Sequence, residues 1–140
     1  MIVAVDLNNK LQIWNIKTKK PAFDLMELNF EVSCLYSPNF FLTGFDNNFL
    51  FIGSDKGDIF ILSLTDFTFT NCYVSFSQIQ SFMNKKKMKN SKLHLVDYVL
   101  NIIINPSNFS EIFIAYQYTG IIIYNLEVNS VFNLYFNKIN

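Results

Sequence analysis

The sequence predicts an all-β chain, and three observations lead to that fold class. Its apolar runs are short and rich in β-branched and aromatic residues, which is typical of strands. Asn, Gly and Asp separate these runs at short intervals, as hairpin turns require. The third observation is a pattern that occurs three times: an apolar strand, a polar turn, and a second apolar strand that ends in a bulky residue. The three copies occupy residues 3–16, 51–64 and 113–126.

Each copy has the turn chemistry of a hairpin. Asn8-Asn9 in the first copy and Lys56-Gly57 in the second supply residues that tolerate a positive φ angle. The third copy carries its glycine one position later, at Gly120. We therefore expect three equivalent β-hairpins. When the copies are aligned without gaps, the bulky residues that coincide are Trp14, Leu62 and Tyr124.

Apolar residues occupy successive positions in these strands, as in Ile121-Ile122-Ile123, rather than alternate positions. Such runs indicate strands that are covered on both faces, as in the blades of a β-propeller. A helix is the competing interpretation, but the β-branched residues and the flanking turns favour strands. The predicted architecture is a partial β-propeller of two to three WD-type blades, each a four-stranded antiparallel sheet.

The linking segments are long enough to complete these blades. Outer strands are expected over residues 22–28, 70–76 and 131–136, and inner strands over 32–36 and 100–104. The spacing of the first two copies lies near the roughly 40–45 residues of a WD repeat. The spacing between the second and third copies is longer, which predicts an inserted loop between them. The blade pieces then span about 1–28, 29–77 and 96–137, with the inserted loop at about 78–92.

The first blade piece lacks an inner strand, and a propeller closes with about four blades or more. We therefore expect the chain to be a fragment, a truncated gene model, or a subunit that must be completed. An open set of blades would expose sheet faces and strand edges that neighbours normally cover.

Composition narrows the classes of function. The 11 Lys and Arg residues balance the 11 Asp and Glu residues, so no global field attracts nucleic acid or an anionic membrane. No apolar run reaches the roughly 18 residues that span a bilayer, and the N-terminus does not resemble a signal peptide. Cys34 and Cys72 lie in separate apolar segments and are expected to be buried thiols in a reducing cytosol.

One concentrated charge stands out, the run Lys85, Lys86, Lys87 and Lys89. It could contact acidic lipid headgroups, where each basic residue contributes about 1 kcal/mol, or an acidic partner surface. It could equally be a solvated loop, since short charge runs are commonly solubilising. These four lysines are the candidate partner or lipid contacts of the sequence.

No catalytic, cofactor-binding or metal-binding residue is predicted. Asp55 and Asp58 flank a hairpin turn, so we expect both carboxylates to point into water. His94 and Asp97 would lie on opposite faces of a strand and form no catalytic pair. Trp14 is expected to be a core anchor between blades. The chain is accordingly predicted to be a non-enzyme.

Several segments resemble a known family. Generic WD repeats carry a Gly-His pair and a Trp-Asp pair. This sequence has no Gly-His pair, and it has Trp14-Asn15 in the place of the Trp-Asp pair. The stretch LQIWNIKTKKP (residues 11–21) looks like the Trp-Asn, basic, Pro segment of tomosyn. FIGSDKGDI (residues 51–59) looks like the family's glycine hairpin, and Asn105-Pro106 followed by IFIAYQYTG (residues 112–120) like its third hairpin. The chain thus resembles the N-terminal propeller of the tomosyn and lethal giant larvae family.

The resemblance implies a cytosolic scaffold that binds syntaxin-type SNAREs and regulates vesicle fusion at the plasma membrane. Some members of the family also support cell polarity, so the resemblance implies a possible role of that kind. Nothing in the sequence is similar to the SNARE-like helix of the tomosyn branch, and no binding residue carries over. The alternative is a generic WD-repeat scaffold for protein–protein interaction in another complex, such as RNA processing or a vesicle coat.

Overall fold

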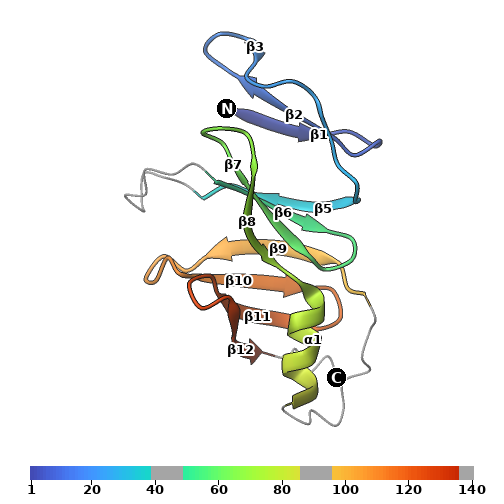
Figure 1. Cartoon of the computed structure of the whole chain (residues 1–140), viewed down its shortest axis with the longest axis vertical. Coiled ribbons are helices and arrows are strands. Elements are labelled where there is room, and N and C mark those ends of the chain that lie inside the picture. The colour runs from blue at the N-terminus through green and yellow to red at the C-terminus, as the bar shows by residue number, and fades with distance from the viewer. Residues whose placement is uncertain (39–48, 86–95, 136–140) are drawn as a thin grey trace. The chain divides into compact units, whose positions relative to one another are not determined.

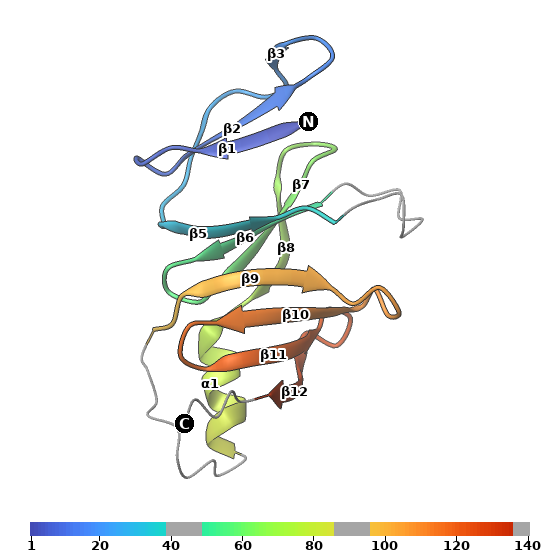
Figure 2. The same ribbon diagram turned by 180° about the vertical axis from the view of Figure 1, so that it is seen from behind.

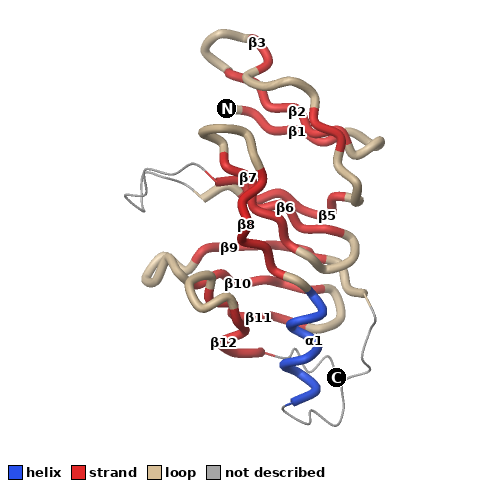
Figure 3. The backbone as a smooth tube through the Cα atoms, in the orientation of Figure 1, coloured by secondary structure: helices blue, strands red, loops and turns tan. Residues whose placement is uncertain are grey.

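The computed structural model describes residues 1–38, 49–85 and 96–135 of the chain (Figure 1). The chain divides into two compact units at residues 32 and 33, which we call the first and second units. They contain three four-stranded antiparallel sheets and one short helix (Figure 3). The predicted fold class, all-β with the four-stranded sheets of a partial propeller, is confirmed.

The sheet of the first unit has the strand order β1 (Ile2–Val5), β2 (Lys10–Asn15), β3 (Lys20–Pro21), and β4 (Met26–Glu27) also pairs with β2. Of the outer strand expected over 22–28, only β4 forms, and β3 pairs with β2 just before the expected range. The amide of the Gln12 side chain donates to the Phe23 carbonyl across the gap between them, at 3.2 Å.

The second and third sheets are simple meanders in which each strand pairs with the next along the chain. Their strands follow the inner-to-outer order expected for a blade. The second sheet contains β5 (Val32–Tyr36), β6 (Phe49–Ser54), β7 (Ile59–Ser63) and β8 (Phe69–Val74). The third contains β9 (Val99–Ile104), β10 (Glu111–Tyr116), β11 (Gly120–Asn125) and β12 (Ser130–Tyr135).

The three hairpins are equivalent, as the repeat predicts. Each bulky residue faces the same position of the preceding strand, in the pairs Ile2↔Trp14, Leu50↔Leu62 and Ile112↔Tyr124. The turns have positive φ at the residues predicted for them: 58° at Asn9, 93° at Gly57 and 97° at Gly120.

A second repeated turn follows the second strand of each hairpin. The Asn15 side chain accepts hydrogen bonds from the backbone N–H groups of Lys17 and Thr18, at 3.0 and 3.2 Å. Asn125 makes the same two bonds in the third sheet. Asn thus performs at this position the turn-forming role that short polar side chains have in general. Four residues beyond the start of each turn, φ is again positive, at Lys19, Phe67 and Asn129.

The inserted loop predicted over 78–92 begins instead with a helix, α1 (Phe76–Lys85). Phe76, Ile79 and Met83 recur at helical spacing and are buried on one face. Two views place α1 beside β11 and β12 (Figures 1 and 2). This apolar stripe stabilises a helix in a segment that was predicted to be a loop from the longer spacing between the second and third copies. Residues 86–92 of the predicted loop lie outside the described residues.

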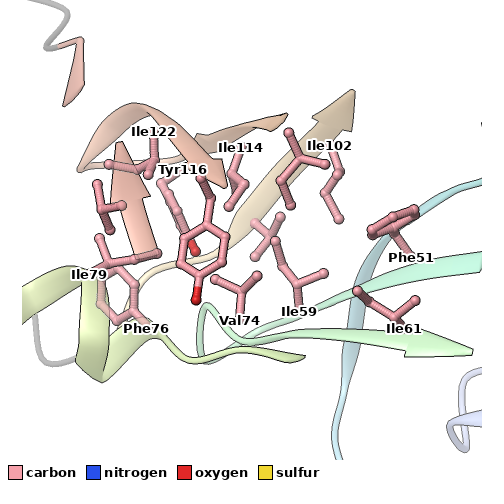
Figure 4. Packing of buried hydrophobic residues seen from close by; sticks show 14 of the residues in the cluster. Phe51, Ile59, Ile61, Val74, Phe76, Ile79, Ile102, Ile114, Tyr116 and Ile122 are labelled. Carbon is pink, nitrogen blue, oxygen red and sulfur yellow. The ribbon is translucent and has the colours of Figure 1, made fainter. Parts of the chain in front are cut away.

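The core of the second unit lies between its two sheets and α1 (Figure 4). Two hydrogen bonds join the inner strands directly: Ser33 Oγ donates to the Val99 carbonyl at 2.8 Å, and Ile104 N donates to Tyr36 Oη at 3.3 Å. The buried cluster consists of Phe51, Ile59, Ile61, Val74, Phe76, Ile79, Met83, Val99, Ile102, Ile112, Ile114, Tyr116, Ile122, Tyr124 and Val131.

Close approach of the sheets explains one glycine within a strand. A Cβ atom on Gly53 would lie 2.7 Å from Cys34 Sγ and 2.8 Å from Val99 Cβ. Both distances are shorter than van der Waals contact, so only glycine fits on β6, between Cys34 of the neighbouring strand β5 and Val99 of β9 in the other sheet.

Candidate interaction surface

The two acids of the second hairpin do not both point into water, so that prediction is wrong. Both residues are half-buried. Asp58 Oδ1 accepts a hydrogen bond of 2.9 Å from the backbone N–H of Phe76, the first residue of α1. This bond satisfies one of the free N–H groups at the helix start. Asp55 Oδ1 is buried without a hydrogen-bond partner in the described part of the chain.

Asp97 has a structural role that the sequence does not reveal. Its carboxylate is fully buried and accepts hydrogen bonds from the backbone N–H groups of Tyr118 (3.1 Å) and Thr119 (2.7 Å). It therefore connects the start of β9 to the turn between β10 and β11. His94, which was expected on the opposite face of the same strand, lies outside the described residues.

Tyr116 connects the two sheets at the same end. Its hydroxyl donates to the Gly57 carbonyl at 2.8 Å, and its ring lies 5.1 Å from the ring of Phe76 between centroids. Burial, then the nearby charges of Asp58 and Asp97, raises the pKa of Tyr116 well above its ordinary value. The phenol therefore stays protonated and remains a hydrogen-bond donor.

Gly57, Asp58, Asp97 and Tyr116 together make a turn cluster. A Cβ atom on Gly57 would lie 2.8 Å from the Asp97 carbonyl oxygen, so the members are in contact. Both carboxylates and the phenol bond to backbone groups. The arrangement fixes strand ends and the helix start, and does not set a nucleophile beside a base.

The two cysteine thiols show no sign of being activated as nucleophiles. Cys34 and Cys72 are free and half-buried, and burial raises the pKa of each. A raised pKa leaves a thiol protonated and weakly reactive. In residues 1–38, 49–85 and 96–135, no group of three or more His, Cys, Asp or Glu side chains lies close enough to hold a metal ion.

Only part of the lysine run can be placed. Lys85 is exposed and ends α1. Lys86, Lys87 and Lys89 lie outside the described residues. The proposed lipid or partner contact of this run stays a prediction.

Trp14 does not form the core anchor that was predicted, because its side chain is 40% exposed. It shares a face of the first sheet with Ile2, its cross-strand partner, which is also exposed. Its equivalent in the third sheet, Tyr124, is fully buried against the core of the second unit. Burial at this position depends on a covering layer and not on the residue type.

The third sheet has one covered face and one that is partly open. Ile112, Ile114 and Tyr116 of β10 face the core and are buried. Phe113 and Ala115 alternate with them and therefore point to the opposite face.

On that opposite face, Phe113 pairs with Ile103 and Ala115 pairs with Ile121. Ile103 is 48% exposed and Ile121 is 38% exposed, while the other two are half-buried. We name these four residues the apolar outer face. Ile103 and Ile121 are thus exposed apolar side chains on one sheet face, a feature that candidate protein-binding surfaces share.

Comparisons with known proteins add no identity: no protein-family model matches the chain, and neither does any curated protein. Among the described residues, no helix has the length and apolar character needed to cross a membrane.

Proposed function

We propose that this chain is a non-enzymatic WD-type scaffold that regulates SNARE-dependent vesicle fusion and exocytosis by binding a syntaxin-type SNARE. Two findings support the proposal. The sequence segments that resemble tomosyn and lethal giant larvae proteins fall in equivalent hairpins of repeated sheets. The third sheet also presents an apolar outer face. The scaffold would act in the cytoplasm, peripherally at the plasma membrane, and in cell polarity as some members of that family do.

The apolar outer face is the observation that carries the proposal. Ile103 and Ile121 expose aliphatic surface on either side of Phe113 and Ala115. A SNARE motif forms an amphipathic helix, and the apolar stripe of such a helix binds an apolar surface by excluding water. Neutral overall charge of the chain means that this contact would depend on apolar area more than on electrostatic steering.

The test measures binding of the 140-residue chain to the cytosolic domain of a syntaxin-type SNARE by isothermal titration calorimetry. The double variant Ile103→Lys/Ile121→Lys should weaken binding at least tenfold, because it places two charges in the contact. Val128→Lys is the matched control, since Val128 is 67% exposed and lies in the turn after β11. It should leave the affinity unchanged.

Two results would count against the proposal. Failure of the wild-type chain to bind the SNARE would overturn the exocytic role and favour the generic interaction scaffold. Equal affinity of the double variant and the wild type would place SNARE binding elsewhere than the apolar outer face.

A further inference from the structure

The turn between β2 and β3 (Figure 1) is strongly basic. It contains Lys17 and Lys19, and Lys20 follows as the first residue of β3; all three side chains are exposed. The salt bridge of the first unit belongs to a different lysine, since Lys10 Nζ lies 3.3 Å from Glu27 Oε1. Among the described residues, no acidic group lies within salt-bridge distance of Lys17, Lys19 or Lys20. We name these three residues the basic turn.

The equivalent turns of the other two sheets lack this charge. The three copies, aligned without gaps, read IKTKK (residues 16–20), LTDFT (64–68) and LEVNS (126–130). In each of them the fourth residue has a positive φ angle, so the turns share a conformation. The second and third segments each contain an acid, Asp66 and Glu127, and no basic residue. The turn conformation therefore does not require positive charge, which is specific to the first sheet.

Lys19 is also an unfavourable residue for the turn itself. Its φ angle is 55°, in the left-handed region that glycine and asparagine adopt most readily. Asn129 occupies the equivalent position in the third sheet, where φ is 49°. An asparagine at residue 19 would form the same turn with less strain. A contact outside the fold therefore explains this lysine better than the fold does.

The backbone of the turn is occupied by its own hydrogen bonds. The N–H groups of Lys17 and Thr18 donate to Asn15 Oδ1, at 3.0 and 3.2 Å. The N–H group of Lys19 donates to the Asn15 carbonyl at 2.9 Å. These three N–H groups cannot also form the concave nest that holds a single small anion. The basic turn instead presents ammonium groups on flexible stems, and each of them acts as a point charge.

We propose that the basic turn contacts the surface of a membrane that contains anionic lipids. A bilayer offers many mobile negative headgroups, which flexible lysines reach without a fixed binding geometry. Recognition of nucleic acid, in contrast, commonly uses Arg forks and backbone N–H groups. Three lysines give a weak and reversible contact that assists attachment without anchoring the chain alone. The proposal rests on the proposed function only for its peripheral membrane location, and it does not depend on SNARE binding.

The test is co-sedimentation of the full 140-residue chain with vesicles at millimolar lipid concentration. Vesicles of phosphatidylcholine with about 30% phosphatidylserine are compared with vesicles of phosphatidylcholine alone. Each lysine near an anionic surface increases partitioning about fivefold, so the variant Lys17→Gln/Lys19→Gln/Lys20→Gln should bind the anionic vesicles about a hundredfold more weakly. Binding of the wild type should also be lost in about 1 M salt, because counterions screen the contact.

A matched control removes the same charge from the other lysine run. The variant Lys85→Gln/Lys86→Gln/Lys87→Gln has the same net charge as the basic-turn variant. It should bind anionic vesicles within about threefold of the wild type, if attraction is local to the basic turn. The single variant Lys19→Asn should bind about fivefold more weakly and melt at a higher temperature, because asparagine adopts the positive φ angle more readily.

Two results would overturn the proposal: no binding of the wild-type chain to anionic vesicles, or equal losses in the two triple variants. Binding to polyglutamate and to a short DNA duplex is measured with the same variants. A loss in the basic-turn variant that occurs with either polymer and not with vesicles would also overturn it. Calorimetric binding of the basic-turn variant to the SNARE should equal that of the wild type, so failure of the vesicle test leaves the SNARE proposal intact.

Discussion

Replacing Tyr116 with Phe tests the contact that joins the two sheets of the second unit. The substitution keeps the ring beside Phe76 and removes only the hydroxyl that donates to the Gly57 carbonyl. That carbonyl is then left buried without its partner, which costs about 1–3 kcal/mol of unfolding free energy. Truncation to Ala would cost more, about 3–5 kcal/mol, because it also opens a cavity.

Urea unfolding followed by far-ultraviolet circular dichroism measures this loss. With a urea m value of about 2 kcal/mol/M, a loss of about 2 kcal/mol lowers the unfolding midpoint by about 1 M. The slope should not change, since the same surface is exposed on unfolding. Tyr98→Phe is the control, because Tyr98 is 46% exposed, and it should shift stability by less than about 0.5 kcal/mol. A midpoint of Tyr116→Phe equal to that of the wild type would refute the hydrogen bond to Gly57.

Three further predictions follow from the same unit. Gly53→Ala should lower the melting temperature, because overpacking against Cys34 costs about 1–3 kcal/mol, and a differential scanning calorimetry trace without that shift would contradict the close approach. Asp97→Ala should cost about 2–3 kcal/mol in urea by removing the acceptor of two backbone N–H groups, with Asp97→Asn less severe; equal losses would contradict this role. Burial raises the pKa of Tyr124 to about 12 from 10.0, so the folded state holds the proton longer than the unfolded state. Stability should therefore fall between about pH 10 and 12, and Tyr124→Phe should reduce that fall; an identical pH profile of the variant would exclude this cause.

Features encoded by neighbouring residues were predictable from the sequence. Asn9, Gly57 and Gly120 lie in short turns whose conformation depends on local backbone freedom, and all three have the expected positive φ. The gap-free alignment of the three copies likewise predicted that Trp14, Leu62 and Tyr124 occupy equivalent positions, as the hairpin registers show.

Features that depend on distant residues were not predictable. Tyr116 and Gly57 are separated by 59 positions, so no local pattern indicates their hydrogen bond. Asp97 likewise acquires its acceptor role only when the β10–β11 turn folds onto it. Exposure of Trp14 reverses an expectation based on residue type, because a large aromatic is buried only where another layer covers it.

Helix α1 was not predicted from the sequence, for a related reason. The helix is short, and only three of its residues are buried in the core, namely Phe76, Ile79 and Met83. Polar residues occupy most of the positions between them. Such a segment is marginal on its own and gains its stability from packing on the sheets. The capping contact from Asp58 comes from 18 residues earlier in the chain.

Methyl NMR on isoleucine-labelled chain tests the interaction-scaffold account most directly. The cytosolic domain of a syntaxin-type SNARE is titrated into the protein, and the methyl shifts of the isoleucines are followed. We expect shifts at Ile103 and Ile121 of the apolar outer face, while Ile102 and Ile114, which are fully buried, stay unchanged. No shift at any isoleucine, or shifts that leave Ile103 and Ile121 unchanged, would contradict it.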